Sequence, residues 1–204
     1  NSGLDFIGDI HGYGSLLESL LQKLGYLRNR NSYEHPEGRQ IVFLGDYIDR
    51  GPEVGKTLRI VRSMVESGNA MAIMGNHEYN AVCFHTPDGE GDYLRSHTDG
   101  NGKNVKQHQS TLDQFIADQG EWNDWIEWFK TLPFYIDGGK WRAVHAAWEF
   151  ESISKLEGKS LLDNEFLKSS ADRSSPDFRV VENVLKGLEV ELPEGVTFED
   201  HNGN

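Results

Sequence analysis

The chain has 204 residues, enough for one domain with a substantial core, and a formal net charge of −13. This acidic balance argues against nucleic acid or an anionic membrane as a general partner. No apolar run reaches the roughly 20 residues that span a bilayer. The one cysteine, Cys83, excludes an intrachain disulfide and favours a reducing, cytoplasmic compartment.

The first third of the chain alternates between two kinds of pattern. Short apolar runs at residues 4–7, 40–44 and 70–74 predict strands, and leucine- and valine-rich segments at 14–24 and 52–66 have helical spacing. The polar segment 26–38 is predicted to be a connecting loop. Such an alternation favours parallel strands joined by helical crossovers, so the predicted fold class is α/β.

The remainder of the chain is less regular. We expect a short helix at 79–84, a polar surface loop or lid at 86–104, and helices at 110–119 and 121–131, the second with its tryptophans in the core. Segments 133–136 and 141–145 flank a glycine-rich turn and predict a hairpin in a mixed or second sheet. Helices are predicted at 149–156, 161–167 and 180–188, followed by a turn and an edge strand at 192–198.

A polar motif follows each of the three predicted parallel strands. The motifs are Gly-Asp-Ile-His-Gly at 8–12, Gly-Asp-Tyr-Ile-Asp-Arg-Gly at 45–51 and Gly-Asn-His-Glu at 75–78. Open α/β sheets bind their ligands at the carboxyl ends of the strands. The sequence therefore predicts that these side chains meet at one edge of the sheet.

The ligand types in the motifs predict a centre of two metal ions. Asp9 and His11 lie two residues apart, so in an extended segment both point to one side and can hold one cation. Asp46 can bridge two cations, Asn76 offers an amide oxygen, and His145 supplies a further nitrogen. A set of nitrogen and oxygen ligands without thiolate favours manganese, iron, zinc or magnesium.

Other residues of the motifs suit phosphate chemistry. The guanidinium of Arg50 is a planar fork for two phosphate oxygens. His77 can protonate a leaving oxygen if a carboxylate, for which Asp49 is the candidate, orients its ring. Taken singly, Asp49 and Arg50 also fit a solvated ion pair, and His77 a helix start. Four further histidines in polar surroundings are predicted to be solvated loop residues: His35, His85, His97 and His108.

The three motifs resemble the signature of the calcineurin-like metallophosphoesterases. The Asp-Arg-Gly ending at 49–51 is similar to the phosphoprotein phosphatase branch, and Val-His-Ala-Ala-Trp at 144–148 to its next metal motif. The bacterial diadenosine tetraphosphatases and small Ser/Thr phosphatases are the most similar types. The resemblance implies a single catalytic domain over 1–204, built as two mixed β-sheets in a sandwich flanked by helices.

The resemblance also implies a role for each motif residue. Asp9, His11 and Asp46 would bind the first metal ion, and Asp46, Asn76 and His145 the second, with manganese as the first choice. Phosphate would contact Arg50, Asn76 and His77, with His77 as the acid and Asp49 supporting it. A hydroxide held by the metals would then hydrolyse a phosphoprotein or a dinucleoside polyphosphate.

The sequence departs from the family pattern after His145. The family has a further histidine ligand preceded by glycine, whereas the only later histidine here is His201, which lacks that context. Either the chain is a fragment of a longer protein or the second metal site is weaker. The alternative function is therefore a phosphate-binding regulatory module with an incomplete, poorly active metal site. The oligomeric state is left open.

Overall fold

Three parallel strands form the sheet that carries the motifs. The structure, a computed structural model, describes residues 3–98, 102–188 and 195. Strands β1 (Leu4–Ile7), β4 (Gln40–Phe43) and β5 (Ala70–Ala72) are hydrogen-bonded in the order β1-β4-β5. Both pairs are parallel. The predicted strands and the α/β class are confirmed.

Helices α1 (Gly14–Lys23) and α2 (Val54–Glu66) are the crossovers between these strands. Val54, Leu58 and Val61 recur at helical spacing and are fully buried, which fixes the inner face of α2. The predicted loop at 26–38 instead contains an antiparallel hairpin, β2 (Leu27–Asn29) and β3 (Ser32–Glu34). Strands of three residues are too short for an alternating pattern to be recognised in the sequence.

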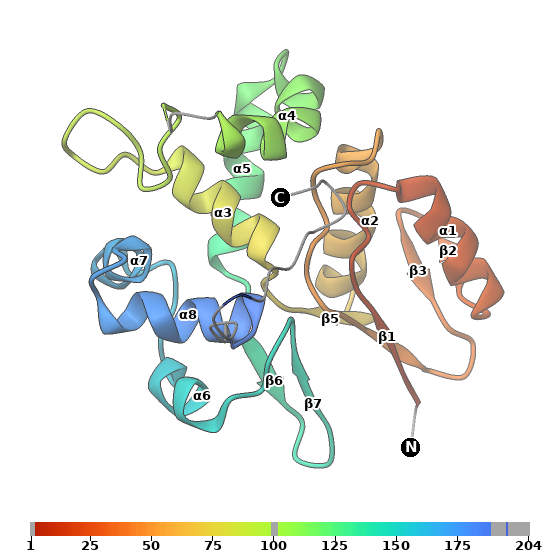
Figure 1. The fold of residues 1–204 in the computed structure, drawn as a ribbon. Coiled ribbons are helices and arrows are strands. Elements are labelled where there is room, and N and C mark those ends of the chain that lie inside the picture. The colour runs from red at the N-terminus through yellow and green to blue at the C-terminus, as the bar shows by residue number, and fades with distance from the viewer. Residues whose placement is uncertain (1–2, 99–101, 189–194, 196–204) are drawn as a thin grey trace.

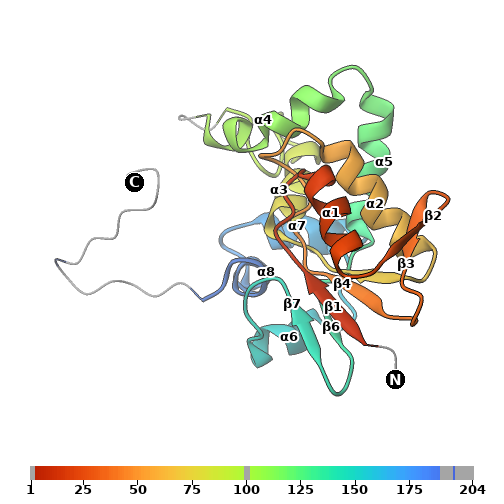
Figure 2. The ribbon, with the colours of Figure 1, turned by 90° about the vertical axis from the view of Figure 1, so that its right-hand side faces the viewer.

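A second layer of strands packs against the parallel sheet. Strands β6 (Tyr135–Asp137) and β7 (Arg142–Val144) form the predicted hairpin, and Ala143 is buried in one cluster with Val42 and Ile73. The two layers lie close together in Figure 2. Among the described residues each sheet is wholly parallel or wholly antiparallel, so the expected pair of mixed sheets is not seen there.

Helices rather than strands follow β7, which explains this difference. Helices α6 (Phe150–Leu156), α7 (Asn164–Ala171) and α8 (Pro176–Lys186) lie across the molecule from α1 and α2, with α3 (Asn76–His85) between the two groups (Figure 1). The edge strand predicted at 192–198, and His201, fall outside the described residues except for position 195.

Two further helices cover α3. Helix α5 (Gln119–Lys130) buries Trp122, Trp125 and Phe129, as predicted for its aromatic stripe. Helix α4 (Lys103–Phe115) begins earlier than the expected start at residue 110. The earlier start could not be predicted from an apolar pattern, because the inner face of the helix carries the polar His108 and Thr111. Of the helices in the described residues, none has the length and apolar character needed to cross a bilayer.

Candidate metal centre and catalytic residues

Backbone pairing continues beyond the strands and brings the first two motifs together. The amide of His11 donates to the carbonyl of Asp46 (2.8 Å), and the amide of Gly12 donates to that of Tyr47 (2.7 Å). The amide of Gly51 donates back to the carbonyl of His11 at 2.8 Å. These bonds hold the two loops side by side beyond the ends of β1 and β4. The side chains after the two strands therefore lie beside each other.

The loops hold an unusual concentration of left-handed backbone. Six non-glycine residues of the described chain have positive φ, and five of them belong to the first two motifs: Asp9, His11, Asp46, Asp49 and Arg50. Each such residue costs on the order of 1–3 kcal/mol and persists only where its surroundings enforce it. Such strain is characteristic of functional sites. Asp9 and His11 therefore do not lie in the extended segment expected from the sequence, although each still offers a ligand atom close to Asp46.

Gly75 and Glu78 allow the third motif to lie directly against the second. A Cβ on Gly75 would lie 2.3 Å from the amide nitrogen of Asp46, so no larger residue fits there. The buried Glu78 carboxylate accepts hydrogen bonds from the amides of Asp46 (2.8 Å), Tyr47 (2.7 Å) and Gly75 (3.1 Å). Burial raises the pKa of Glu78 to about 8, and the neighbouring charge of Asp46 adds to this.

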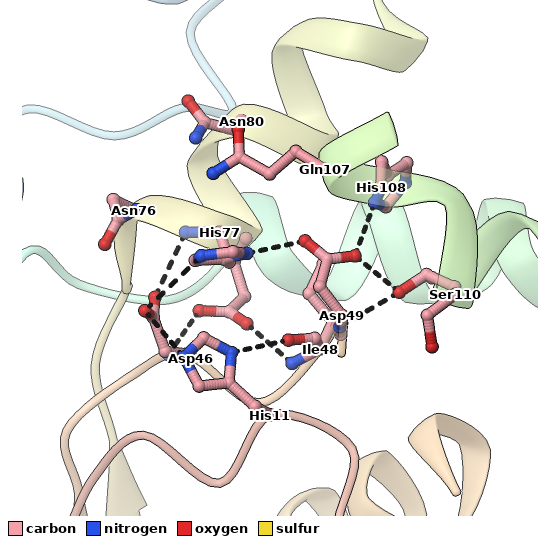
Figure 3. Close-up of polar contacts among 12 residues, drawn as sticks. His11, Asp46, Ile48, Asp49, Asn76, His77, Asn80, Gln107, His108 and Ser110 are labelled. Atoms are coloured by element: carbon pink, nitrogen blue, oxygen red, sulfur yellow. Dashed lines mark hydrogen bonds and ion pairs between the residues drawn. The ribbon is translucent and has the colours of Figure 1, made fainter. Parts of the chain in front are cut away.

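A first group of candidate metal ligands consists of His11, Asp46 and His77, all buried (Figure 3). Nε2 of His11 is 3.6 Å and Nε2 of His77 is 3.8 Å from Oδ2 of Asp46. His11 donates Nδ1–H to the carbonyl of Ile48 (3.0 Å), so its Nε2 lone pair is directed to the centre. Asp9, the most exposed of the predicted ligands, reaches within 3.9 Å of the same nitrogen.

A second group shares Asp46 with the first. Asp9, Asp46 and His145 each offer an atom within metal-ligand reach of the others. Nε2 of His145 lies 3.5 Å from Oδ1 of Asp46 and 2.9 Å from Oδ1 of Asn76. Nδ1–H of His145 donates to the carbonyl of Leu44 (2.6 Å), which again leaves Nε2 as the ligand atom. The structure thus brings all five predicted metal ligands together around one carboxylate.

The surroundings of Asp46 fit divalent cations. Asp46 is only 4% exposed. Within the described part of the chain its charged partners are three histidines, and no lysine or arginine is paired to it. A buried carboxylate without a permanent positive partner is unfavourable unless a cation neutralises it. Divalent cations held by the imidazole, carboxylate and amide groups around Asp46 would satisfy this requirement.

Asp49 and His77 form the buried pair expected from the sequence. Nδ1 of His77 lies 2.6 Å from Oδ2 of Asp49, so the ring donates to the carboxylate. Burial alone would lower the pKa of His77, but the bond to Asp49 and the charge of Asp46 raise it above its ordinary value. His77 is therefore held with Nε2 toward the centre and can carry a proton there.

Helix α4 supplies two partners of Asp49 that the sequence analysis did not identify. His108 donates from Nδ1 to Oδ1 of Asp49 (2.8 Å), and the hydroxyl of Thr111 donates to the same oxygen (2.6 Å). Burial would raise the pKa of Asp49, yet the bonds from His108 and His77 hold it well below its usual range. The expectation that His108 and His85 are solvated loop residues is wrong. His108 is buried on the inner face of α4, and His85 lies at the end of α3, where its Nε2 accepts from Trp122 (2.8 Å).

Arg50 lies at the open side of this centre. It is exposed and, within the described residues, makes no hydrogen bond or ion pair. The pKa of His11 is lowered mainly by burial, and the nearby charge of Arg50 lowers it further. Its guanidinium is therefore available to an anion.

The role of Glu78 as an acceptor of backbone amides could have been predicted from the sequence. A glutamate at the third position of a helix often accepts a hydrogen bond from the amide before the helix.

The fold and these side chains together define a protein with a candidate metal site at the carboxyl edge of a parallel sheet. The chain belongs to the calcineurin-like phosphoesterase family, whose sequence model matches residues 4–191.

Curated relatives match a shorter part of the chain. A bis(5'-nucleosyl)-tetraphosphatase of Halalkalibacterium halodurans is 47% identical over 73 residues, and that of Bacillus subtilis is 42% identical over 73 residues. Each match covers 36% of this chain and 30% of the relative. Of solved structures, a cold-active protein tyrosine phosphatase is 17% identical, with a TM-score of 0.50 over 89% of this chain and 52% of that one. The latter similarity concerns the fold alone.

Proposed function

We propose that this protein hydrolyses phosphoesters or phosphoanhydrides with two divalent metal ions. The observation that carries the proposal is the pair of ligand groups that share the buried Asp46. When bound, two such ions supply an activated water and positive charge for in-line attack on phosphorus. Asp9, His11 and Asp46 would hold one ion, and Asp46, Asn76 and His145 the other.

The remaining side chains of the centre have roles that do not depend on a ligand bond. Arg50, with Asn76 and His77, binds the oxygens of the reacting phosphate and stabilises the charge that develops on them. His77 then donates its proton to the leaving oxygen, and Asp49 holds the ring so that Nε2 faces that oxygen. Because the attacking group is water, Cys83 has no part in the reaction; burial raises the pKa of its thiol to about 12.

We propose manganese as the metal and a cytoplasmic location, on the basis of the mixed nitrogen and oxygen ligands and the single cysteine. Two substrate classes fit the centre, phosphoserine or phosphothreonine in proteins and dinucleoside polyphosphates. The names of the curated relatives favour the second.

The test uses protein stripped of metal by a chelator, with manganese added back stepwise. We expect hydrolysis of p-nitrophenyl phosphate to rise as two equivalents bind, counted by elemental analysis. The variant Asp46→Asn should lose more than the roughly 10–100-fold typical of changes beside a metal ligand. The matched variant Asp124→Asn, at an exposed position on α5, should keep wild-type activity. A wild-type protein that binds one ion or none and shows no turnover would contradict the proposal.

A further inference from the structure

A cleft of about 700 Å³ lies between α3 and the helices near the end of the described chain. The loop after α3 and the start of α4 line the same side as α3, and α7 and α8 flank the other side. This volume lies within the range of small-molecule sites, roughly 300–1,000 Å³. The motif residues 8–12 and 45–51 do not line it, so it is distinct from the centre around Asp46.

The cleft is basic although the chain is acidic. Its charged lining consists of Arg95, Lys103, Arg173, Lys186 and Glu182. Glu182 is paired with Lys186, with Nζ 2.6 Å from its carboxylate oxygens. Within the described residues Lys103 and Arg173 take part in no ion pair. A chain of formal net charge −13 thus concentrates positive charge in one concave place, which raises the local concentration of anions.

Asn80 connects this cleft to the centre. It lines the cleft and lies one helical turn after Asn76 on α3, so the two side chains are on the same face, about 5–6 Å apart at Cβ. Arg95 donates from Nη1 to Oδ1 of Asn80 (2.9 Å) and from Nη2 to Oε1 of Gln107 (3.2 Å). Figure 3 shows Asn80 and Gln107 side by side above His77. These bonds hold Arg95 against α3, the helix that also carries Asn76 and His77.

We propose that this cleft is an anion-binding subsite that takes the phosphate groups beyond the reacting phosphorus. The inference rests on the proposed function and specifies an organic polyphosphate as the ligand class. Arg95 would contact the nearest additional phosphate, and Lys103 and Arg173 the more distant ones. Phe178 and Leu94 line the same cleft and provide apolar surface for the organic group at the end of the chain. A substrate with one phosphate would leave the subsite empty.

The test compares substrates that differ in length. Lys103→Ala and Arg173→Ala change exposed side chains, and Lys23→Ala, an exposed lysine at the end of α1, is the matched control. We expect the ratio of KM for diadenosine tetraphosphate to KM for p-nitrophenyl phosphate to rise by at least roughly 10-fold in each cleft variant, as for a lost hydrogen bond to a charged group. The control should keep the wild-type ratio.

A binding measurement separates this inference from the proposed function. Calorimetric titration with inorganic tripolyphosphate should show weaker binding to the double variant Lys103→Ala/Arg173→Ala than to wild type and to Lys23→Ala, whether or not the protein turns over. Equal binding to all three would overturn the subsite, as would an unchanged KM ratio. A KM increase confined to acidic phosphopeptides would also overturn it, since the ligand would then be a protein. Failure of wild-type turnover with weakened tripolyphosphate binding would contradict the proposed function alone.

Discussion

Asp49 connects two histidines that come from different helices. Its Oδ2 accepts from His77 on α3, and its Oδ1 accepts from His108 and Thr111 on α4. The amide of Asp49, in left-handed backbone, donates to Oγ1 of Thr111 at 3.0 Å. The carboxylate therefore has one orientation, and that orientation determines where the His77 ring points.

The first prediction concerns the hydroxyl of Thr111. Thr111→Val removes it at nearly constant volume and leaves the buried amide of Asp49 without an acceptor, which should cost roughly 1–3 kcal/mol in the free energy of unfolding. Because His77 is then less well held, kcat should fall more for phenyl phosphate than for p-nitrophenyl phosphate, whose leaving group needs less protonation. Thr111→Ser, which keeps the hydroxyl, should restore both. An equal fall for the two substrates would mean that Thr111 acts only on stability.

The packing of α3 against α5 is the element-scale contact that supports the centre. Nε1–H of Trp122 on α5 donates to Nε2 of His85 at the end of α3 (2.8 Å). This bond requires the neutral ring, and burial, with smaller effects from His108 and His97, lowers the pKa of His85 to about 4. The contact between the two helices is therefore sensitive to acid.

The second prediction follows from the sign of that shift. Because the folded pKa of about 4 lies below the ordinary value of 6.5, the unfolded chain binds more protons between these pH values. The free energy of unfolding should therefore fall as pH is lowered from about 6.5 to 4, with His85 accounting for roughly 1–2 kcal/mol after allowance for its partial exposure. Urea titrations of His85→Gln should show a smaller fall. The control Asn123→Ala, at an exposed position on α5 that does not titrate, should keep the wild-type slope. An unchanged slope in His85→Gln would refute the assignment.

At the scale of the whole molecule, one apolar cluster runs from Ile7 on β1 to Leu185 on α8. The candidate metal centre lies where β1, β4, β5 and α3 meet, and His145 reaches it from the end of the β6–β7 hairpin. Metal ions bound there would link segments that are distant in the chain. Their binding free energy would consequently add to the stability of the fold.

The third prediction is that metal raises the melting temperature. Manganese at about 100 times its Kd should stabilise the folded state by about 2.7 kcal/mol per site, which for a chain of this size corresponds to roughly 5–10 °C. Differential scanning calorimetry with and without a chelator measures the shift. Asp46→Asn should abolish it, whereas Asp124→Asn should retain it. A shift of equal size in both variants would place the stabilising ions elsewhere.

The three motifs after the strands, and the edge of the sheet at which they meet, could be predicted from the sequence alone. The reason is that each apolar strand, the motif after it and the helical crossover are adjacent in the sequence. Parallel strands then bring their carboxyl ends to one edge of the sheet. The sequence also indicated the partnership of Asp49 with His77, because both belong to recognisable motifs. The short hairpin at 27–34 could not be predicted, because a strand of three residues is too short to show an alternation of apolar and polar residues.

Only the tertiary structure decided which groups surround those motifs. His108 and Thr111 contact Asp49 across 59 and 62 residues of sequence, from a helix with a polar inner face that no apolar periodicity marks. The basic cleft combines Lys103 at the start of α4 with Arg173 in the turn between α7 and α8, and the two residues share no motif. Contacts of this kind depend on how helices pack over the sheet, and packing is a property of the folded chain rather than of any local stretch of residues.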